Sequence, residues 1–263
     1  MSNNSAGSTG VAGGGVQSVD RAVAVLEILA EHGEFGVSEV ASAMDVHKST
    51  AFRLLGALEA HGMVEQDGER GKYRLGFGIV RLAGAVTGRI AVTRYGRKIC
   101  DRLAQELGET MNIAVLEAHC VINLDQVRGP AAIAAQNWVG RQTPLHSTSN
   151  GKVLLAHLSP GLRHELIAEA GLPRTTPRTL TSEEELERAL AEVRERGYAL
   201  TLEEYEEGLN AIAAPVRSAD GETVAALTAS GPAYRFTEQR MHEIAPALMA
   251  GADRISLRLS SAG

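Results

Sequence analysis

One short helical segment carries side chains of the kinds that contact nucleic acid. On a helical wheel, Ser49, Phe52 and Arg53 lie together with Gly56 and Ala57, away from the leucines of the same segment. A face with a cation, a hydroxyl group and two very small residues can approach a DNA groove closely and form hydrogen bonds there. The solvated face of an ordinary helical hairpin is the alternative interpretation.

A second set of polar residues could hold a small anion. In PLHSTSNGKVLLAHL a polar run leads into an apolar helix, so Ser149 and Asn150 stand at the helix start. The first backbone N–H groups of a helix have no partner within it and bind anions well. Thr228 and Ser230 share one face of a predicted strand and could line the same pocket. Simple helix capping and a polar outer sheet face are the alternatives.

Catalysis and metal binding have much weaker support. The pair Gly151 and Lys152 lacks the upstream glycine and the following hydroxyl residue of a P-loop, and no G-x-S-x-G motif is present. His146 stands near Ser147 and Ser149, but no carboxylate can be named that would orient it. The histidines lack metal-ligand spacing, and two cysteines make no metal motif. We therefore predict no catalytic residue, no metal ligand and no cofactor.

Three predicted helices must position the nucleic-acid face. Apolar residues at helical spacing predict helices over 18–31, 37–44 and 51–58. A short break separates the last two, so they can cross and share one core as a helix-turn-helix. Asp45 falls in this break, where the turn needs a residue that tolerates a left-handed backbone.

A hairpin follows this helix pair. Residues 63–66 and 72–75 have the pattern of two short strands separated by turn residues, which predicts a wing. Arg70 and Lys72 lie at or near its tip, where they could reach phosphate or the minor groove. A surface hairpin with unrelated charges is the alternative.

Length and charge set the broader limits. The chain has 263 residues, which predicts two domains, and its Gly/Ser/Asn-rich start at 1–15 predicts a disordered tail. The net charge is −6, yet residues 47–90 carry seven basic and four acidic residues, which is compatible with phosphate contacts. The absence of long apolar runs, of signal-peptide features and of a disulfide framework predicts a cytoplasmic protein without membrane contact.

The remainder of the chain mixes helices and strands. A weakly apolar helix with three glycines is predicted to connect the domains from about residue 78. Strands joined by turns, with helices gathered around them, predict an α+β domain with a mostly antiparallel sheet. The predicted strands are 111–117, 120–127, 133–138, 198–202, 209–216 and 223–230, and the predicted helices are 92–107, 152–157, 162–169, 182–196 and 237–259.

Six motifs in order resemble the IclR family of transcriptional regulators over about residues 16–259. They are VQSVDRAVAVLEIL at 16–29, HKSTAFRLLGALEAHGMV at 47–64, YRLG at 73–76, PLHSTSNGKVLLA at 144–156, RGYAL and EEYEEGLNAIAAPV within 196–216, and ALTASGP at 226–232. The resemblance implies a winged helix-turn-helix at 16–77, a linker helix at 78–91, and a GAF-like effector and oligomerisation domain at 92–260.

The resemblance also implies a ligand-responsive, DNA-binding regulator, in most members a repressor of a catabolic operon. Such proteins act as homodimers or homotetramers on palindromic or repeated operators in double-stranded DNA, and a transcriptional activator is the alternative. Three groups of DNA-contacting residues are implied, in the reading helix, at the start of the first helix and in the wing. They are Lys48, Ser49, Thr50 and Arg53; Gln17, Ser18 and Arg21; and Arg70 and Lys72.

A small organic acid is the implied effector, with its carboxylate on backbone N–H groups at the helix start. Members that bind small 2-oxo acids have an aspartate and a cysteine where this chain has Thr201 and Ala211. The lost charge and thiol favour a larger or less polar carboxylate over glyoxylate or pyruvate. The implied effector positions are Ser149, Asn150, Thr201, Ala211, Thr228 and Ser230.

Two other classes of protein make different predictions. An enzyme tethered to DNA requires a catalytic constellation in residues 92–263, and the sequence reveals none. A purely structural DNA-binding protein would not be stabilised by a ligand, and its second domain would have no need to be so large.

Overall fold

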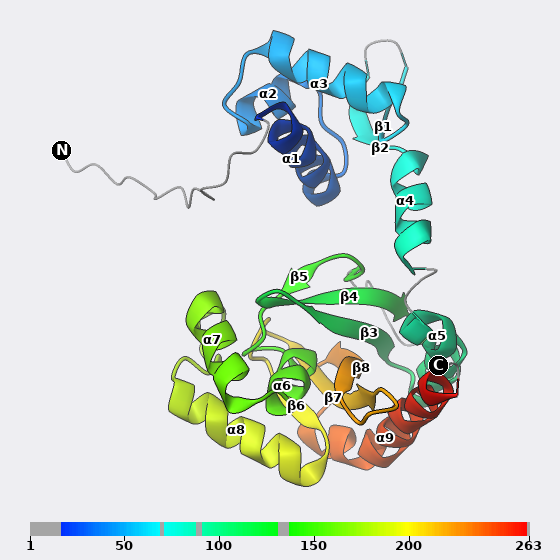
Figure 1. Cartoon of the computed structure of the whole chain (residues 1–263), viewed down its shortest axis with the longest axis vertical. Coiled ribbons are helices and arrows are strands. Elements are labelled where there is room, and N and C mark those ends of the chain that lie inside the picture. Colours follow the sequence, from blue (N-terminus) through cyan, green and yellow to red (C-terminus); the bar gives the residue numbers. More distant parts are fainter. Residues whose placement is uncertain (1–16, 69–70, 88–90, 131–136, 262–263) are drawn as a thin grey trace, which may run out of the picture. The chain divides into compact units, whose positions relative to one another are not determined.

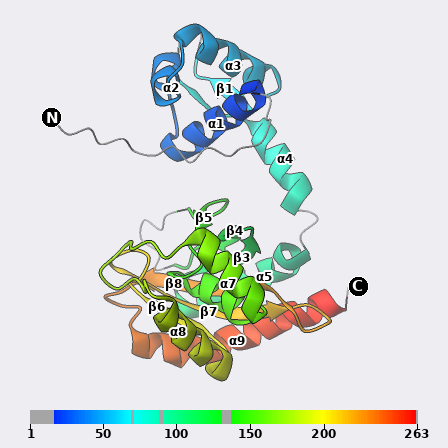
Figure 2. The same cartoon turned by 60° about the vertical axis from the view of Figure 1, so that its left-hand side comes forward.

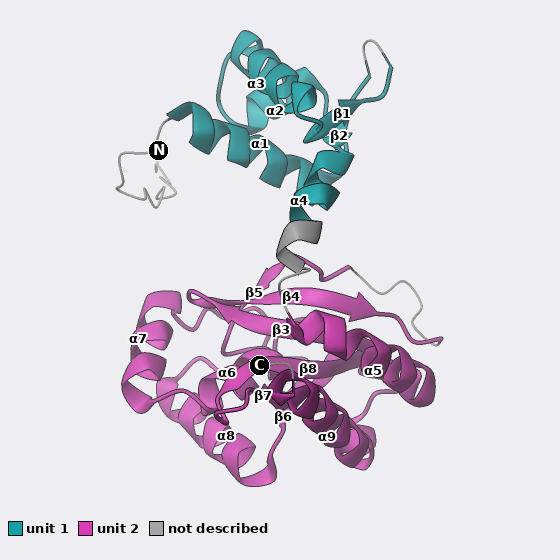
Figure 3. Ribbon diagram, turned by 45° about the vertical axis from the view of Figure 1, so that its right-hand side comes forward, with its two compact units in different colours: residues 1–86 teal, residues 87–263 magenta. Residues whose placement is uncertain are grey.

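A computed structural model describes residues 17–68, 71–87, 91–130 and 137–261. The chain divides into two compact units, residues 1–86 and 87–263 (Figure 3). The predicted linker helix over 78–91 includes residues 88–90, which lie outside the described residues, as does the predicted tail.

Unit 1 has a helix-turn-helix followed by a hairpin and a further helix, as predicted. Val25 and Leu29 of the first helix pack with Ala51 and Leu55 of the third helix and with Tyr73 of the hairpin. These buried positions follow the helical spacing of apolar residues that the sequence shows. The elements are α1 (Gln17–His32), α2 (Val37–Ala43), α3 (Lys48–Ala60), β1 (Val64–Gln66), β2 (Tyr73–Leu75) and α4 (Phe77–Thr87).

The turn between α2 and α3 depends on Asp45. This residue has a φ of 51°, in the left-handed region that most side chains avoid. The backbone N–H of Asp45 donates to the carbonyl of Ser42 and that of Val46 donates to Ala41, which closes the end of α2. The predicted role of Asp45 in the turn is therefore confirmed.

Unit 2 contains a six-stranded sheet in the order β5-β4-β3-β8-β7-β6. Each neighbouring pair of these strands is antiparallel, which confirms the predicted α+β class. The strands are β3 (Thr110–Glu117), β4 (Cys120–Val127), β5 (Gln142–Thr143), β6 (Ala199–Leu202), β7 (Leu209–Arg217) and β8 (Thr223–Pro232).

Helices cover both faces of this sheet (Figures 1 and 2). Along β8, Ala225, Leu227 and Ala229 pack into one core with α5 and α9, whereas Ala226 belongs to a second core with α6 and α8. Alternation along a strand therefore directs Thr228 toward the α6 side. The helices are α5 (Ala91–Leu107), α6 (Ser149–Ala156), α7 (Pro160–Ala170), α8 (Glu183–Arg196) and α9 (Glu238–Ser260).

One edge of the sheet differs from the prediction. The strand expected at 133–138 falls mostly on residues outside the described part, and Trp138 is not in a strand. The edge strand is instead β5, which pairs Gln142 and Thr143 with β4. No helix within the described ranges is long and apolar enough to cross a bilayer.

Candidate ligand pocket and DNA-binding face

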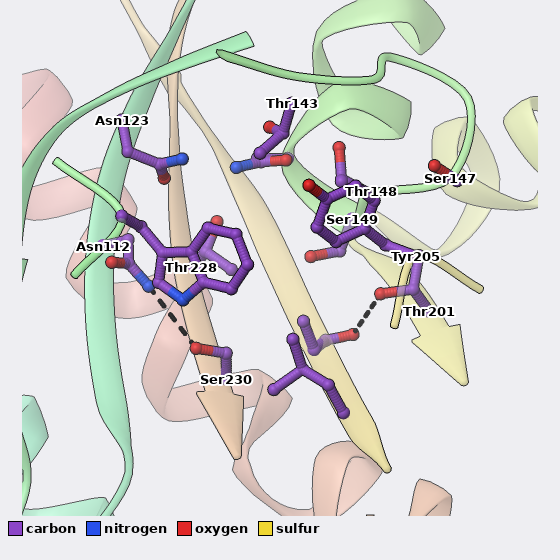
Figure 4. A pocket seen from close by; sticks show the side chains of 14 residues that line it. Asn112, Asn123, Thr143, Ser147, Thr148, Ser149, Thr201, Tyr205, Thr228 and Ser230 are labelled. Carbon is purple, nitrogen blue, oxygen red and sulfur yellow. Dashed lines mark hydrogen bonds between the residues drawn. The ribbon is translucent and has the colours of Figure 1, made fainter. Parts of the chain in front are cut away.

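A pocket in unit 2 lies between the polar face of the sheet and the start of α6 (Figure 4). Its empty space of about 480 Å³, which includes the part open to solvent, suits a small organic molecule better than a polymer. The structure brings together at this pocket all six of the predicted effector positions. These are Ser149, Asn150, Thr201, Ala211, Thr228 and Ser230.

Strand register places the floor residues side by side. Ala211 of β7 pairs with Thr201 of β6 on one side and with Ser230 of β8 on the other. Thr228, which precedes Ser230 by two residues in β8, lies opposite Asn112 of β3. Residues that pair directly across antiparallel strands share a face, so five side chains from four strands form one surface.

The start of α6 forms the opposite wall. The hydroxyl of Thr148 accepts from the N–H of Gly151 at 3.3 Å and donates to the carbonyl of Pro144 at 2.7 Å, which fixes the entry of the chain into the helix. Within the described residues, the N–H groups of Ser149 and Asn150 have no acceptor. Unpaired N–H groups at a helix start attract an anion, as the sequence suggests for this segment.

Five polar side-chain atoms of the pocket are buried without a hydrogen-bond partner in the described structure. Buried polar atoms are almost always paired in folded proteins, so such a group indicates a place for a ligand or for water. Only one other described side-chain atom, Asn210 Oδ1, is in the same state. The five are Asn112 Oδ1, Thr143 Oγ1, Ser147 Oγ, Ser149 Oγ and Thr228 Oγ1.

The described lining of the pocket contains no charged side chain. The nearest buried charges in sequence are Lys152 on α6 and Glu204, which directly precedes the lining residue Tyr205. Lys152 Nζ lies 2.6 Å from both carboxylate oxygens of Glu204. Burial lowers the pKa of Lys152 and raises the pKa of Glu204, while each charge opposes this change in the other.

Two aromatic rings border the pocket. Trp138 and Tyr205 meet edge to face, with their ring centroids 5.8 Å apart. The backbone N–H of Trp138 donates to Gln126 Oε1 at 2.7 Å, which holds the tryptophan against β4. Burial raises the pKa of Tyr205, so its hydroxyl stays protonated at neutral pH and can act as a donor.

His146 makes its described ring contact with the backbone and not with a serine hydroxyl. Its ring Nε2 lies 3.1 Å from the carbonyl of Pro173, and burial lowers the pKa of the imidazole. The hydroxyls of Ser147 and Ser149 have no partner in the described structure, so neither of them is hydrogen-bonded to the His146 ring. The described residues also include no group of three His, Cys, Asp or Glu side chains that could hold a metal ion.

The predicted DNA-contacting face of α3 is exposed. Ser49, Arg53, Gly56 and Ala57 face solvent, as does the adjacent Lys48, and Thr50 is half-buried. Phe52 is 60% exposed, so it does not pack inside the domain.

The start of α1 lies near the start of α3. Arg21 and Thr50 border the same surface hollow as His47, while Gln17 and Ser18 are exposed at the first turn of α1. Arg70 lies outside the described residues.

The described cations of the hairpin are paired with acidic residues. Lys72 Nζ lies 3.5 Å from Glu39 Oε2, and the same carboxylate oxygen accepts from the N–H of Gly36 at 2.7 Å. Arg74 pairs with Glu65 at 2.7 Å and with Glu34 at 3.6 Å. A phosphate that approaches Lys72 therefore has to compete with Glu39.

The sequence predicted fewer than half of the lining residues individually. Ser147 and Thr148 belong to the polar run before α6, and Tyr205 and Leu209 lie in a family motif. Asn112, Asn123, Trp138 and Thr143 had no signal, because a strand pattern does not reveal which strand becomes the neighbour of another. The lining residues not predicted individually are Asn112, Asn123, Trp138, Thr143, Ser147, Thr148, Tyr205 and Leu209.

Both units match described protein families. Residues 18–68 match the IclR helix-turn-helix domain, and residues 84–257 match the C-terminal domain of bacterial IclR transcriptional regulators. The transcriptional regulator XynR of Escherichia coli is 35% identical over 216 residues, which cover 82% of this chain and 86% of XynR. KdgR of the same organism is 32% identical over 244 residues, or 93% of each chain.

A solved structure extends the likeness to the fold. An IclR homologue from Microbacterium hydrocarbonoxydans, complexed with 4-hydroxybenzoate, is 30% identical and superimposes with a TM-score of 0.78. The match covers 92% of this chain and 98% of that one. The chain therefore belongs to the IclR family of bacterial transcriptional regulators.

Proposed function

We propose that the pocket of unit 2 binds a small organic acid and that this binding changes how unit 1 binds its operator. The observation that carries this proposal is the group of five unpaired, buried polar atoms in the pocket, which come from the sheet and from the start of α6. The carboxylate would accept from the N–H groups of Ser149 and Asn150. A relative that binds 4-hydroxybenzoate, itself an organic acid, supports the assignment.

In this proposal the protein is a repressor that acts in the cytoplasm and catalyses no reaction. Two or four copies would bind a palindromic or repeated operator, since one small DNA-binding unit buries too little surface for tight, specific binding. The acid would favour one arrangement of the effector domains, and the predicted linker helix over 78–91 would convey this to the DNA-binding units.

On the DNA side, the exposed residues of α3 would enter the major groove. Lys48, Ser49, Thr50 and Arg53 would make groove and phosphate contacts, and Gln17, Ser18 and Arg21 would contact the DNA backbone. Arg70 and Lys72 would serve the wing.

Arg53→Ala tests this assignment. If Arg53 reads a base, the change should cost about 1–3 kcal/mol of operator affinity and relax the sequence preference at one position. The measurement is selection of bound duplexes from a random library, sequenced for the full chain and for the variant at two salt concentrations. An equal loss on all sequences would make Arg53 a phosphate contact, and wild-type selection without any preferred site would contradict sequence-specific binding.

Glu39→Gln should strengthen binding to duplex DNA of random sequence. The change frees Lys72 for a phosphate while an amide oxygen remains to accept from Gly36, and because an exposed ion pair of this kind is weak, the gain should be small. The gain should shrink as salt is added.

Glu27→Gln provides the matched control. Glu27 is exposed on α1, and its substitution changes the net charge by the same amount as Glu39→Gln does. Both variants are compared with the wild type by fluorescence anisotropy of a labelled duplex. Equal gains in DNA affinity for the two variants would show that the effect comes from net charge alone. No gain for Glu39→Gln would show that Lys72 does not contact DNA.

A further inference from the structure

The pocket has two polar ends, and the start of α6 accounts for only one of them. The second end lies on the floor, where Asn112 of β3 and Thr228 of β8 face each other in the sheet (Figure 4). Each of these residues is only 4% exposed. A bare carboxylate at α6 leaves this second end without a partner.

We infer that the effector carries a hydroxyl group at the end remote from its carboxylate, and that Asn112 and Thr228 recognise this hydroxyl. The inference rests on the proposed acid site and adds the chemistry of the other end of the ligand. It makes Asn112 and Thr228 residues that determine specificity.

The polar atoms on the floor favour a hydroxyl group over other chemical groups. Asn112 Nδ2 donates to Ser230 Oγ at 3.4 Å, which leaves Asn112 Oδ1 and Thr228 Oγ1 unpaired. An amide oxygen only accepts, whereas the threonine hydroxyl can donate. A ligand hydroxyl can donate to Asn112 Oδ1 and accept from Thr228 Oγ1 at the same time.

The other kinds of terminal group fit poorly. A hydrocarbon end would leave both buried atoms unpaired after water is expelled, which is costly for buried polar groups. A second carboxylate would meet an amide oxygen in a pocket whose described lining includes no cation to offset its charge. The resemblance suggested an effector that is either larger or less polar than glyoxylate and pyruvate. The polar atoms on the floor of the pocket therefore favour the larger acid.

Matched pairs of acids test the inference by calorimetry on the full chain. The probes are 4-hydroxybenzoate against benzoate, and 6-hydroxyhexanoate against hexanoate, each pair differing only in the terminal hydroxyl. For each pair that binds, we expect the affinity of the hydroxylated acid to be about tenfold or more higher than that of its partner. Thr228→Val, which replaces the hydroxyl by a methyl group, should remove this preference, and Thr228→Ser should keep it.

Each outcome separates this inference from the proposed function. Equal affinity within both pairs, or tighter binding of the acids without the hydroxyl, would contradict the inference that the effector carries a terminal hydroxyl group. The proposed carboxylate site would not be affected by that result. A hydroxyl preference that survives in Thr228→Val would overturn the role of Thr228. Failure of all four acids to bind at millimolar concentration would count against the acid site itself, and the wild-type comparison remains decisive if Thr228→Val does not fold.

Discussion

Replacing Lys152 by methionine should lower the free energy of unfolding of unit 2 by about 3–5 kcal/mol, the usual cost of breaking a buried ion pair by removing one partner. Lys152 and Glu204 are 3% and 9% exposed, and the ammonium group lies 2.6 Å from both carboxylate oxygens. Without Lys152, the Glu204 carboxylate would stay buried with no countercharge. The large loss of unfolding free energy comes from this unpaired buried carboxylate, since an intact buried pair adds little net stability.

The measurement is denaturant unfolding of the full chain, followed by tryptophan fluorescence. The chain contains one tryptophan, and Trp138 lies in unit 2, so the signal reports the unfolding of that unit. The double variant Lys152→Met with Glu204→Leu is the control, because it leaves no charge unpaired and should recover much of the loss. A cost well below 1 kcal/mol for Lys152→Met would show that water reaches the carboxylate.

The loss in Lys152→Met should also depend on pH. Burial raises the pKa of Glu204, so in the variant the folded state binds a proton more readily than the unfolded state does. The penalty is therefore present in full when the carboxyl is ionised in the folded state, and it shrinks as the pH falls and the carboxyl takes up a proton. The double variant should lack this dependence on pH.

The same pair connects two walls of the pocket. Lys152 belongs to α6, whose first turn carries Ser149, and Glu204 directly precedes Tyr205. The backbone carbonyl of Glu204 also accepts from threonine hydroxyls, with Thr179 Oγ1 at 2.7 Å. We therefore expect ligand affinity to fall in Lys152→Met even under conditions in which the variant stays folded.

The sequence predicted best those features that depend on neighbours along the chain. Helical spacing predicted the first helix, in which Val25 and Leu29 are core residues, and it placed Arg53 on the face of its helix that is exposed. Alternation along one strand placed Thr228 and Ser230 on a common face, and the polar run before α6 indicated the helix start. In each case a local period decides which side of an element a residue occupies.

The features that the sequence did not reveal depend on long-range pairing. Asn112 meets Ser230 across a separation of 118 residues, because β3 lies beside β8 at the centre of the sheet. Nothing in either strand pattern identifies the other as its partner. The sequence pattern predicts a strand that ends at Trp138, although this residue lies outside the strands and lines the pocket.

Gly151→Ala should disrupt the start of α6 and with it the pocket. A Cβ at this position would lie 2.2 Å from the carbonyl oxygen and 2.6 Å from the Cα of Leu145, both of them backbone atoms that cannot turn aside. The segment before the helix would have to move, and it carries Ser147 and Thr148. Crowding of this kind costs about 1–3 kcal/mol or more, which exceeds the roughly 1 kcal/mol that alanine gains over glycine in a helix.

Gly161→Ala is the matched control, because Gly161 lies in the first turn of α7 and a Cβ there would meet nothing within 4 Å. That variant should be as stable as the wild type or slightly more so, and its affinity for an acid that the wild type binds should be unchanged. In Gly151→Ala the unfolding midpoint should fall, and binding of the acid, measured by calorimetry, should be lost. If Gly151→Ala binds the acid normally, the segment before α6 can shift without closing the pocket, and the N–H groups at the helix start cannot be what holds the carboxylate in place.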